Sequence, residues 1–186
     1  MIHLESGDHD ASKLRVGSPF SSVSTFVEPP LSPRSRPDLI SKFPLVLTCA
    51  KSLRYCESQH RQIAELRRAA PDPQVEVHPD TAAARGISAG DWVLISTPNG
   101  AVRARAKFNA GLDRGVVCAQ HGWWQGCDEL DLPPSDPFEI GGVNLNLVLR
   151  QTPSDPVSGS SPLRASLCDV APAEAQSALR STSGTE

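Results

Sequence analysis

The stretch WVLISTPNGAVRARAKF, residues 92–108, has strand-forming residues on both sides of a Pro-Asn-Gly turn. Asn-Gly favours a tight hairpin because both residue types tolerate a positive φ. After the turn, Val102, Ala104 and Ala106 alternate with basic residues, which is typical of a strand with one buried and one solvated face. We therefore expect an antiparallel β-hairpin formed by residues 92–97 and 101–108.

Shorter segments on either side of this hairpin also have strand character. They are FPLVLT at 43–48, VEVHP at 75–79 and VVCA at 116–119. Residues 54–70 have Ile63, Leu66 and Ala70 at helical spacing before Pro71, which predicts a helix. A second, short helix is expected at 79–86, because proline favours a first turn and glycine a helix end. Several short strands with two brief helices predict a mainly β protein with a small barrel or closed sheet.

The two ends of the chain differ in composition from the middle. Residues 1–40 are rich in Ser and Pro, including PPLSPRSRP at 29–37, and bury too little apolar surface to offset the entropy of ordering. We expect a disordered tail and linker at 1–40, a barrel domain at 41–172 and a polar tail at 173–186. Residues 173–179 of that last tail could form a short helix.

Overall composition excludes several classes of protein. The 186 residues carry a formal net charge of −3, without the strongly basic face of a nucleic-acid-binding domain. Apolar runs are strand-length, so membrane insertion is not expected. The first residues, MIHLESGDHDASKL, lack the apolar region of a secretory signal. Five cysteines at irregular spacing favour reduced thiols. Together these features predict a cytoplasmic protein.

The stretch CAQHGWWQGC, residues 118–127, holds candidate metal ligands. Cys118, His121 and Cys127 are plausible donors, and Cys49 and Cys56 lie upstream. Structural zinc sites are usually built on close ligand pairs such as Cys-x2-Cys, and this sequence contains no such pair. Free cysteine otherwise behaves as a small apolar side chain. We therefore predict no metal site here.

A catalytic thiol is a second possible reading of the cysteines. Cys56 and His60 lie four residues apart and could share a helix face, where the imidazole would lower the pKa of the thiol. The sequence supplies no third group to orient the histidine. We therefore assign no catalytic residue.

Trp123 and Trp124 are adjacent, with Gly122 and Gly126 on either side. Neighbouring residues of an extended chain point to opposite faces, so one ring is expected in the core. The other would face the surface, a ligand or another domain. Glycine on both sides suits a loop that allows close backbone approach.

The polar stretch RYCESQHR, residues 54–61, directly follows a predicted buried strand. Anionic ligands are often held at such a position by backbone N–H groups together with serine and arginine. A solvated helix face is the alternative interpretation.

Taken in order, these segments resemble the C-terminal molybdopterin-dinucleotide-binding domain of the DMSO-reductase-type molybdenum oxidoreductases. The resemblance continues through GGVNLNLV at 141–148 and DPVSGSSPLRASLCDV at 155–170, and covers residues 26–172. It implies a double-psi β-barrel. The SQHR sequence at 58–61 is similar to that of the thiosulfate, polysulfide or acetylene hydratase branch.

The resemblance also implies a set of cofactor-binding residues in five segments. The first cofactor loop, usually TTGR or similar in the family, is TCAK at 48–51 here, with Cys and Ala in place of Thr and Gly. The implied contacts are Thr48, Lys51, Ser58, Gln59, His60, Arg61, His121, Gly122, Trp123, Asn144, Asp155 and Ser158. Amide and imidazole groups can match a pterin or guanine edge, and arginine can bind phosphate.

The family's iron–sulfur cysteine motif and its metal ligand have no match here, while residues 26–42 resemble its interdomain linker. We therefore expect a detached C-terminal domain or subunit of a molybdenum-dependent oxidoreductase, not catalytic alone. The implied cofactor is bis-molybdopterin guanine dinucleotide carrying molybdenum or tungsten, and the implied partner is a larger catalytic polypeptide. A split subunit, a gene fragment and a truncated product all fit. The alternatives are a stand-alone zinc- or thiol-dependent β-barrel enzyme and a nonfunctional gene remnant.

Overall fold

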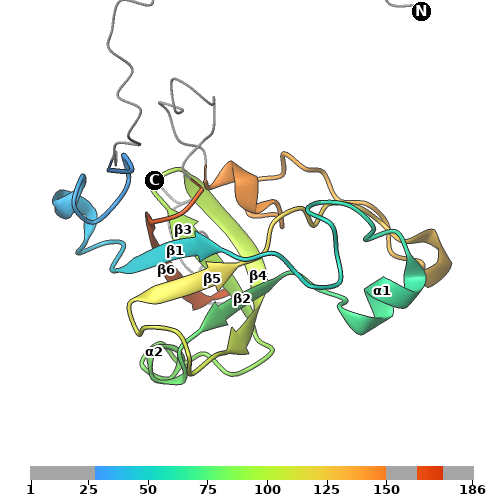
Figure 1. Ribbon diagram of the computed structural model, residues 1–186, viewed down its shortest axis with the longest axis horizontal. Helices are drawn as coiled ribbons and strands as arrows, with labels where there is room; N and C mark the ends of the chain where they lie inside the picture. The colour runs from blue at the N-terminus through green and yellow to red at the C-terminus, as the bar shows by residue number, and fades with distance from the viewer. Residues whose placement is uncertain (1–27, 150–162, 174–186) are drawn as a thin grey trace, which may run out of the picture.

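The computed structural model describes residues 28–149 and 163–173, and the fold of this part is mainly β (Figure 1). Within these residues, six strands close into a barrel in the order β1-β5-β2-β4-β3-β6. They are β1 (Leu45–Cys49), β2 (Gln74–Val77), β3 (Trp92–Thr97), β4 (Gly100–Phe108), β5 (Val116–Ala119) and β6 (Ser166–Pro172). The prediction of a closed barrel with few short helices is confirmed.

The β3–β4 hairpin is confirmed, but its turn lies one residue earlier than expected. Thr97 pairs with Gly100, so Pro98 and Asn99 are the two central residues of the turn. Proline has its φ held near −65°, which suits the second position of a common turn and leaves only Gly100 with a positive φ, 139°. The expectation that Asn-Gly occupies the centre of the turn was therefore wrong.

The core lies inside the barrel. Val102, Ala104 and Ala106 of β4 are each at most 3% exposed, which confirms the alternation predicted from the sequence. Val93 and Ile95 face them from β3. The 3-10 helix η4 (Leu145–Leu147) and the residues after it add further apolar side chains to this core.

The strand β6 was not predicted, yet it closes the barrel by pairing with both β1 and β3. Leu167, Cys168 and Val170 of this strand are at most 1% exposed. Their alternation is interrupted because Leu167, which lies between two inward positions, is buried as well. The Leu167 amide donates to the Leu31 carbonyl oxygen at 2.8 Å.

Within the described residues the helices are short. They are α1 (Ala64–Ala69) and α2 (Pro79–Ala83), with 3-10 turns at η2 (Pro37–Leu39), η3 (Asp128–Leu130) and η4. The α2 helix is as predicted: the His78 side chain caps it, and Gly86 after it has a φ of +66°. Of the segment 54–70, in which a helix was expected, only the last part is helical, as α1. Ile63 precedes α1 and is 38% exposed, so its predicted place on the apolar face was wrong, and Ala64 is buried instead.

Part of the predicted tail lies against the barrel. Ser32 is 1% exposed, and residues 28–40 contain turns and η2. Residues 1–27 and 174–186, including most of the predicted short helix at 173–179, lie outside the described residues. The domain boundaries therefore stay a prediction. Among the helices that the structure describes, none is long and apolar enough to cross a membrane.

Strand direction gathers the polar loops at one edge of the barrel. Strands β1 and β5 are parallel neighbours, with Thr48 opposite Cys118, so both chains leave the barrel at the same edge. Strand β2 runs antiparallel to β5 and therefore begins there. The segments 50–73 and 120–135 both extend beyond this end of the barrel, together with α1 (Figure 1).

Candidate functional site

The two polar segments predicted to bind a ligand meet at this edge. The Ala50 amide donates to the Ala119 carbonyl oxygen at 3.2 Å, which continues the pairing of β1 and β5 into the loops. Farther out, Gly122 packs against Ser58. A Cβ atom on Gly122 would lie 2.5 Å from Ser58 Cα, and the φ of Gly122 is +77°, so both space and conformation require glycine.

Arg61 joins the same two segments from within. Its guanidinium donates to the carbonyl oxygens of Glu57 at 2.9 Å and His121 at 2.7 Å. The backbone amide of Arg61 also donates to Gln125 Oε1 at 3.2 Å. The side chain is only 1% exposed. Arg61 therefore holds the loop after β1 to the loop after β5.

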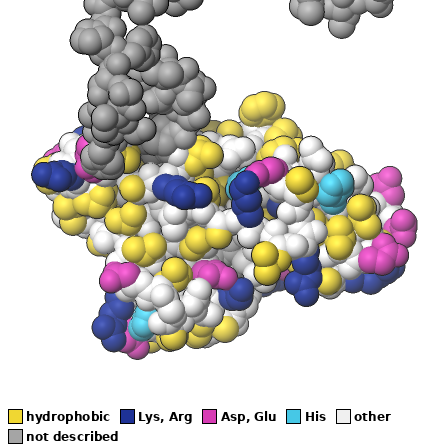
Figure 2. Space-filling view, viewed as in Figure 1, with side chains coloured by type: hydrophobic (Ala, Val, Ile, Leu, Met, Phe, Trp, Pro, Cys, Tyr) yellow, Lys and Arg dark blue, Asp and Glu magenta, His cyan; other side chains and the backbone are white. Residues whose placement is uncertain are grey.

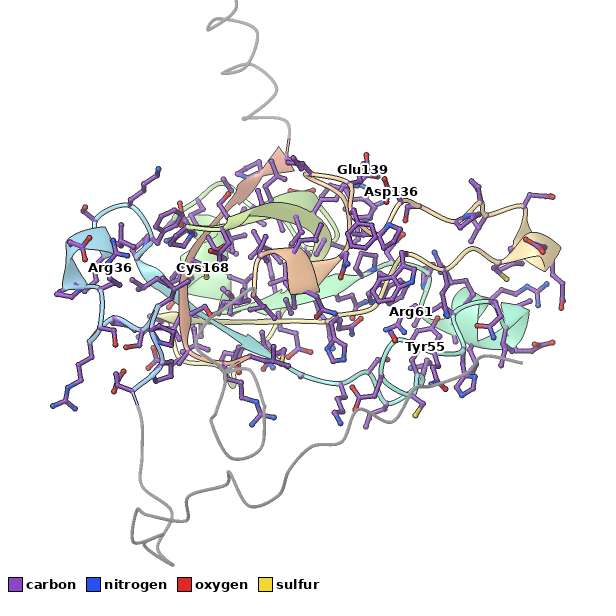
Figure 3. The ribbon with its side chains drawn as sticks, turned by 90° about the horizontal axis from the view of Figure 1, so that it is seen from above. Arg36, Tyr55, Arg61, Asp136, Glu139 and Cys168 are labelled. Carbon is purple, nitrogen blue, oxygen red and sulfur yellow. The ribbon has the colours of Figure 1, made fainter. Side chains whose placement is uncertain are left out.

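Two aromatic rings enclose this guanidinium. Its central carbon lies 4.6 Å from the centroid of the Tyr55 ring and 4.7 Å from that of Trp123. Figure 3 shows Arg61 and Tyr55 together at this end of the molecule, far from Arg36. Burial lowers the pKa of Arg61 to about 10, so the group stays charged at neutral pH. No described carboxylate forms an ion pair with it, and the carbonyl dipoles and ring faces compensate the charge instead.

Tyr55 connects the cluster that it forms with Arg61 and Trp123 to α1. Its hydroxyl donates to the carbonyl oxygens of Ala70 at 2.7 Å and Leu66 at 3.1 Å, at the C-terminal end of the helix. The ring packs edge-to-face on Trp123, with centroids 5.4 Å apart. Burial raises the pKa of Tyr55. This role of Tyr55 was not predicted, because a lone tyrosine in a polar stretch carries no distinguishing signal.

Trp123 is the buried member of the tryptophan pair, as expected, and Trp124 is half-buried. The Trp123 side chain is 2% exposed, and its indole Nε1 has no hydrogen-bond partner among the described residues. The Arg67 guanidinium also lies against this ring, 5.1 Å from its centroid, and donates to the Gln125 carbonyl oxygen at 3.1 Å. Arg67 and Gln125 complete the cluster and were missed in the sequence analysis.

The outer surface of the site carries charge. Glu57 pairs with Lys51 through one carboxylate oxygen and with His121 Nε2 through the other, the latter at 2.9 Å. The Lys51 and His121 contacts lower the pKa of Glu57, and Glu57 raises the pKa of Lys51. Basic, acidic and histidine side chains adjoin on one face of the molecule in Figure 2. We call Lys51, Glu57 and His121 the surface triad.

The remaining predicted residues fall into three groups. Thr48 lies on β1, one residue before the strand ends, and Ser58, Gln59 and His60 lie in the loop between β1 and α1, with His60 at a φ of +73°. Asn144 is elsewhere, capping η4: its amide nitrogen donates to Pro137 O at 2.7 Å and its oxygen accepts from Asn146 N at 3.2 Å. Asp155 and Ser158 lie outside the described residues.

The cysteines do not converge on a metal site. All five are free, and Cys127 Sγ donates to the Gln62 carbonyl oxygen at 3.3 Å. Nowhere in 28–149 or 163–173 do three or more His, Cys, Asp or Glu side chains gather as a metal ion requires. Cys56 and His60 lie in turns rather than on a helix, so the shared helix face considered for them is wrong.

We expect only weak, selective thiol reactivity. In the folded protein, iodoacetamide should modify the exposed Cys56 well before Cys118 and Cys168, because burial raises the pKa of both of those thiols. Peptide mapping by mass spectrometry over time measures this, and a denatured sample in which all five thiols react is the control. Modification of Cys118 ahead of Cys56 would contradict the prediction and favour a thiol-dependent enzyme.

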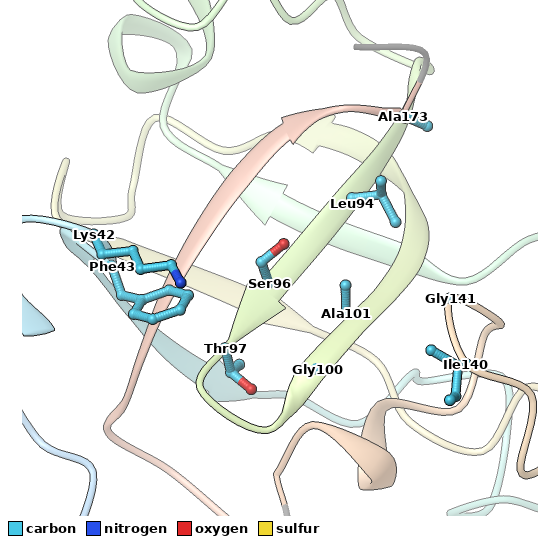
Figure 4. Close-up of a pocket in the computed structure, with 10 residues that line it drawn as sticks. All are labelled: Lys42, Phe43, Leu94, Ser96, Thr97, Gly100, Ala101, Ile140, Gly141 and Ala173. Atoms are coloured by element: carbon cyan, nitrogen blue, oxygen red, sulfur yellow. The ribbon is translucent and has the colours of Figure 1, made fainter. Parts of the chain in front are cut away.

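A separate cavity of about 430 Å³ lies against the β3–β4 hairpin (Figure 4). Its lining includes Leu94, Ala101 and Ile140, and Lys42 is its one charged residue. A dinucleotide needs several cationic or amide groups, so this cavity does not suit one. None of the predicted cofactor-binding residues that the structure describes lines it.

The fold and the site thus define a β-barrel ligand-binding domain with a polar surface formed by the loops that follow the parallel strands β1 and β5. We call this surface the platform. Residues 45–167 match the family described as "Molydopterin dinucleotide binding domain". The chain belongs to this family of molybdopterin-dinucleotide-binding domains, which form part of the DMSO-reductase-type molybdoenzymes.

Several relatives are similar over most of the chain. Dopamine dehydroxylase from Eggerthella lenta is 36% identical over 144 residues, which are 77% of this chain and 14% of the relative. Acetylene hydratase from Syntrophotalea acetylenica is 30% identical over 120 residues, 64% of this chain and 16% of the relative. A solved structure of acetylene hydratase from Pelobacter acetylenicus has a TM-score of 0.66 and 26% identity, covering 80% of this chain and 21% of that one. The chain therefore corresponds to a small part of these larger proteins.

Proposed function

We propose that the platform at the carboxyl edge of β1 and β5 binds the dinucleotide part of bis-molybdopterin guanine dinucleotide. The observation that carries this proposal is the joining of two segments about sixty residues apart, 58–61 and 121–123, by Arg61 and Gly122. Both segments are those that the family resemblance assigns to the cofactor. A rigid platform lowers the entropic cost of binding, because the loops are ordered before the ligand arrives.

The residues present fit such a ligand. Lys51 supplies a cation for phosphate, the turn at Ser58, Gln59 and His60 supplies hydroxyl, amide and imidazole groups for a heterocyclic edge, and His121 adds a second imidazole. Gly122 allows the loop after β5 to pack directly against Ser58, which keeps these groups close together. The bound cofactor would supply the molybdenum or tungsten centre for redox chemistry, while this chain would only bind and orient it.

The buried residues of the predicted set have a different proposed role. Arg61 and Trp123 are at most 2% exposed, so we assign them to holding the platform in shape. Asn144 uses both ends of its amide within the chain, which supports a role in ordering the loop from 137 to 146. Contacts from Thr48, Asp155 and Ser158 to the cofactor remain proposals from the resemblance.

We also propose a larger catalytic polypeptide as the partner. The curated relatives are much longer, and this chain spans 13–16% of their lengths. Such a polypeptide would carry the metal ligand and the second half of the cofactor site, so this chain would not be catalytic alone. Double-psi connectivity of the barrel and a cytoplasmic location are further proposals, the latter supported by five free cysteines.

Guanosine diphosphate is a suitable probe of the platform, because it contains the nucleotide half of the proposed cofactor. Substituting Gln59→Ala should weaken its binding about two- to tenfold, as expected for one lost hydrogen bond. The control is Gln62→Ala, a neighbouring exposed glutamine outside the predicted set, which should bind like the unaltered protein. Calorimetry or NMR titration measures the dissociation constants.

The proposal also predicts that the chain, coexpressed with its larger partner, retains the dinucleotide through purification. Mass spectrometry and absorbance of the purified complex detect it. Failure of the unaltered chain to bind guanosine diphosphate, or turnover of a substrate by the chain alone, would contradict the proposed function.

A further inference from the structure

The surface triad lies at the junction of the two cofactor segments. Lys51 follows β1 and His121 follows β5, while Glu57 belongs to the turn between β1 and α1. One oxygen of the Glu57 carboxylate faces the Lys51 ammonium, and the other is 2.9 Å from His121 Nε2. A single carboxylate therefore engages one potential phosphate-binding group from each segment.

The backbone directs Glu57 into this position. Its φ is +51°, which is uncommon for a residue other than glycine and costs conformational energy. The buried Arg61 stabilises this conformation, because its guanidinium donates to the Glu57 carbonyl oxygen at 2.9 Å. The Gln59 amide donates to the Cys56 carbonyl oxygen at 2.8 Å and closes the turn around it. Glu57 is thus placed by the same cluster that forms the platform.

The triad is exposed enough to exchange partners. The side chains of Lys51 and Glu57 are 68% and 48% exposed, and that of His121 is 17% exposed. Ion pairs at such exposure contribute little to folding stability. A diphosphate has more negative charge and more acceptor oxygens than one carboxylate, so it competes well for the same two donors.

We propose that Glu57 is an internal counter-anion, which occupies Lys51 and His121 in the free domain and is displaced by the diphosphate of the cofactor. This inference rests on the proposed function. It assigns His121, together with Lys51, to the diphosphate rather than to a heterocyclic edge. It also makes Glu57 a specificity-determining residue, because a weakly charged ligand would not displace its carboxylate.

The test compares the binding of guanosine diphosphate and inorganic pyrophosphate to the unaltered protein and to Glu57→Gln. Glutamine keeps the size and removes the charge, so we expect both ligands to bind about three- to tenfold more tightly at low ionic strength. The matched control is Asp38→Asn, which also removes one negative charge from an exposed pair, at Arg36. Arg36 lies at the other end of the molecule from Arg61 (Figure 3), so this variant should bind like the unaltered protein.

A second variant tests the cationic partner. Lys51→Met should weaken binding of pyrophosphate, and in combination with Glu57→Gln it should remove most of the gain. Equal or weaker binding by Glu57→Gln, or an equal gain in Asp38→Asn, would overturn the inference. Because guanosine diphosphate would still bind the unaltered protein in that case, the proposed function would stand. Absence of binding by every form would contradict both.

Discussion

Replacing Arg61 with alanine is expected to lower the free energy of unfolding by about 3 kcal/mol or more and to separate the two loops of the platform. The change removes two charge-assisted hydrogen bonds, each worth roughly 1.5–3 kcal/mol. It also removes contacts with two ring faces, worth about 2 kcal/mol when desolvated. The cost of burying the charge offsets part of this sum. Urea unfolding followed by tryptophan fluorescence measures the difference, since Trp123 lies beside the guanidinium.

Two further substitutions sharpen this test. Arg68→Ala, at an exposed arginine of α1, should change stability by less than about 0.5 kcal/mol. Arg61→Lys keeps a charge but lacks the planar fork that reaches Glu57 and His121 together, so its stability should fall between the two. If Arg61→Ala were as stable as Arg68→Ala, the guanidinium would not hold the platform together.

Replacing Gly122 with alanine is expected to destabilise the domain by about 3 kcal/mol and to weaken binding of guanosine diphosphate. Alanine at a φ of +77° costs roughly 1–2 kcal/mol, and a Cβ atom 2.5 Å from Ser58 Cα forces the two backbones apart. Thermal or urea unfolding measures the stability change, and titration measures the loss of binding.

Gly90 provides the matched control for this substitution. Its φ is +86°, but no atom lies within 4 Å of the position that a Cβ would take. Gly90→Ala should therefore show only the conformational cost, about 1–2 kcal/mol, with binding unchanged. Equal effects of the two substitutions would mean that contact between Gly122 and Ser58 does not shape the site.

The parts of the fold that the sequence predicted are those with strong local patterns. Alternation at Val102, Ala104 and Ala106 predicted β4, and a proline-to-glycine segment predicted α2. The shift of the hairpin turn by one residue follows from Pro98, whose fixed φ outweighs the preference of Asn-Gly. The β6 strand was missed because no turn signal in the sequence marks its ends and because its burial depends on pairing with β1 and β3.

The segment before α1 shows most clearly where local reasoning fails. Helical spacing suggested that residues 54–63 belong to a helix, yet they form turns with positive φ at Glu57 and His60. Such turns persist because contacts with distant residues, such as Arg61 with His121, hold them. Local propensity cannot predict a conformation that is stabilised from sixty residues away.

The sequence by itself determined the closed mainly β barrel, the family, and the segments in which the candidate site lies, because apolar periodicity and ordered motifs are local properties. Only the tertiary structure decided what each residue in those segments does. It buries Arg61 and Trp123 as supports, because parallel pairing of β1 with β5 stacks their loops on one another. It leaves Lys51, Glu57 and His121 at the surface, since they lie at the outer rim of the same junction.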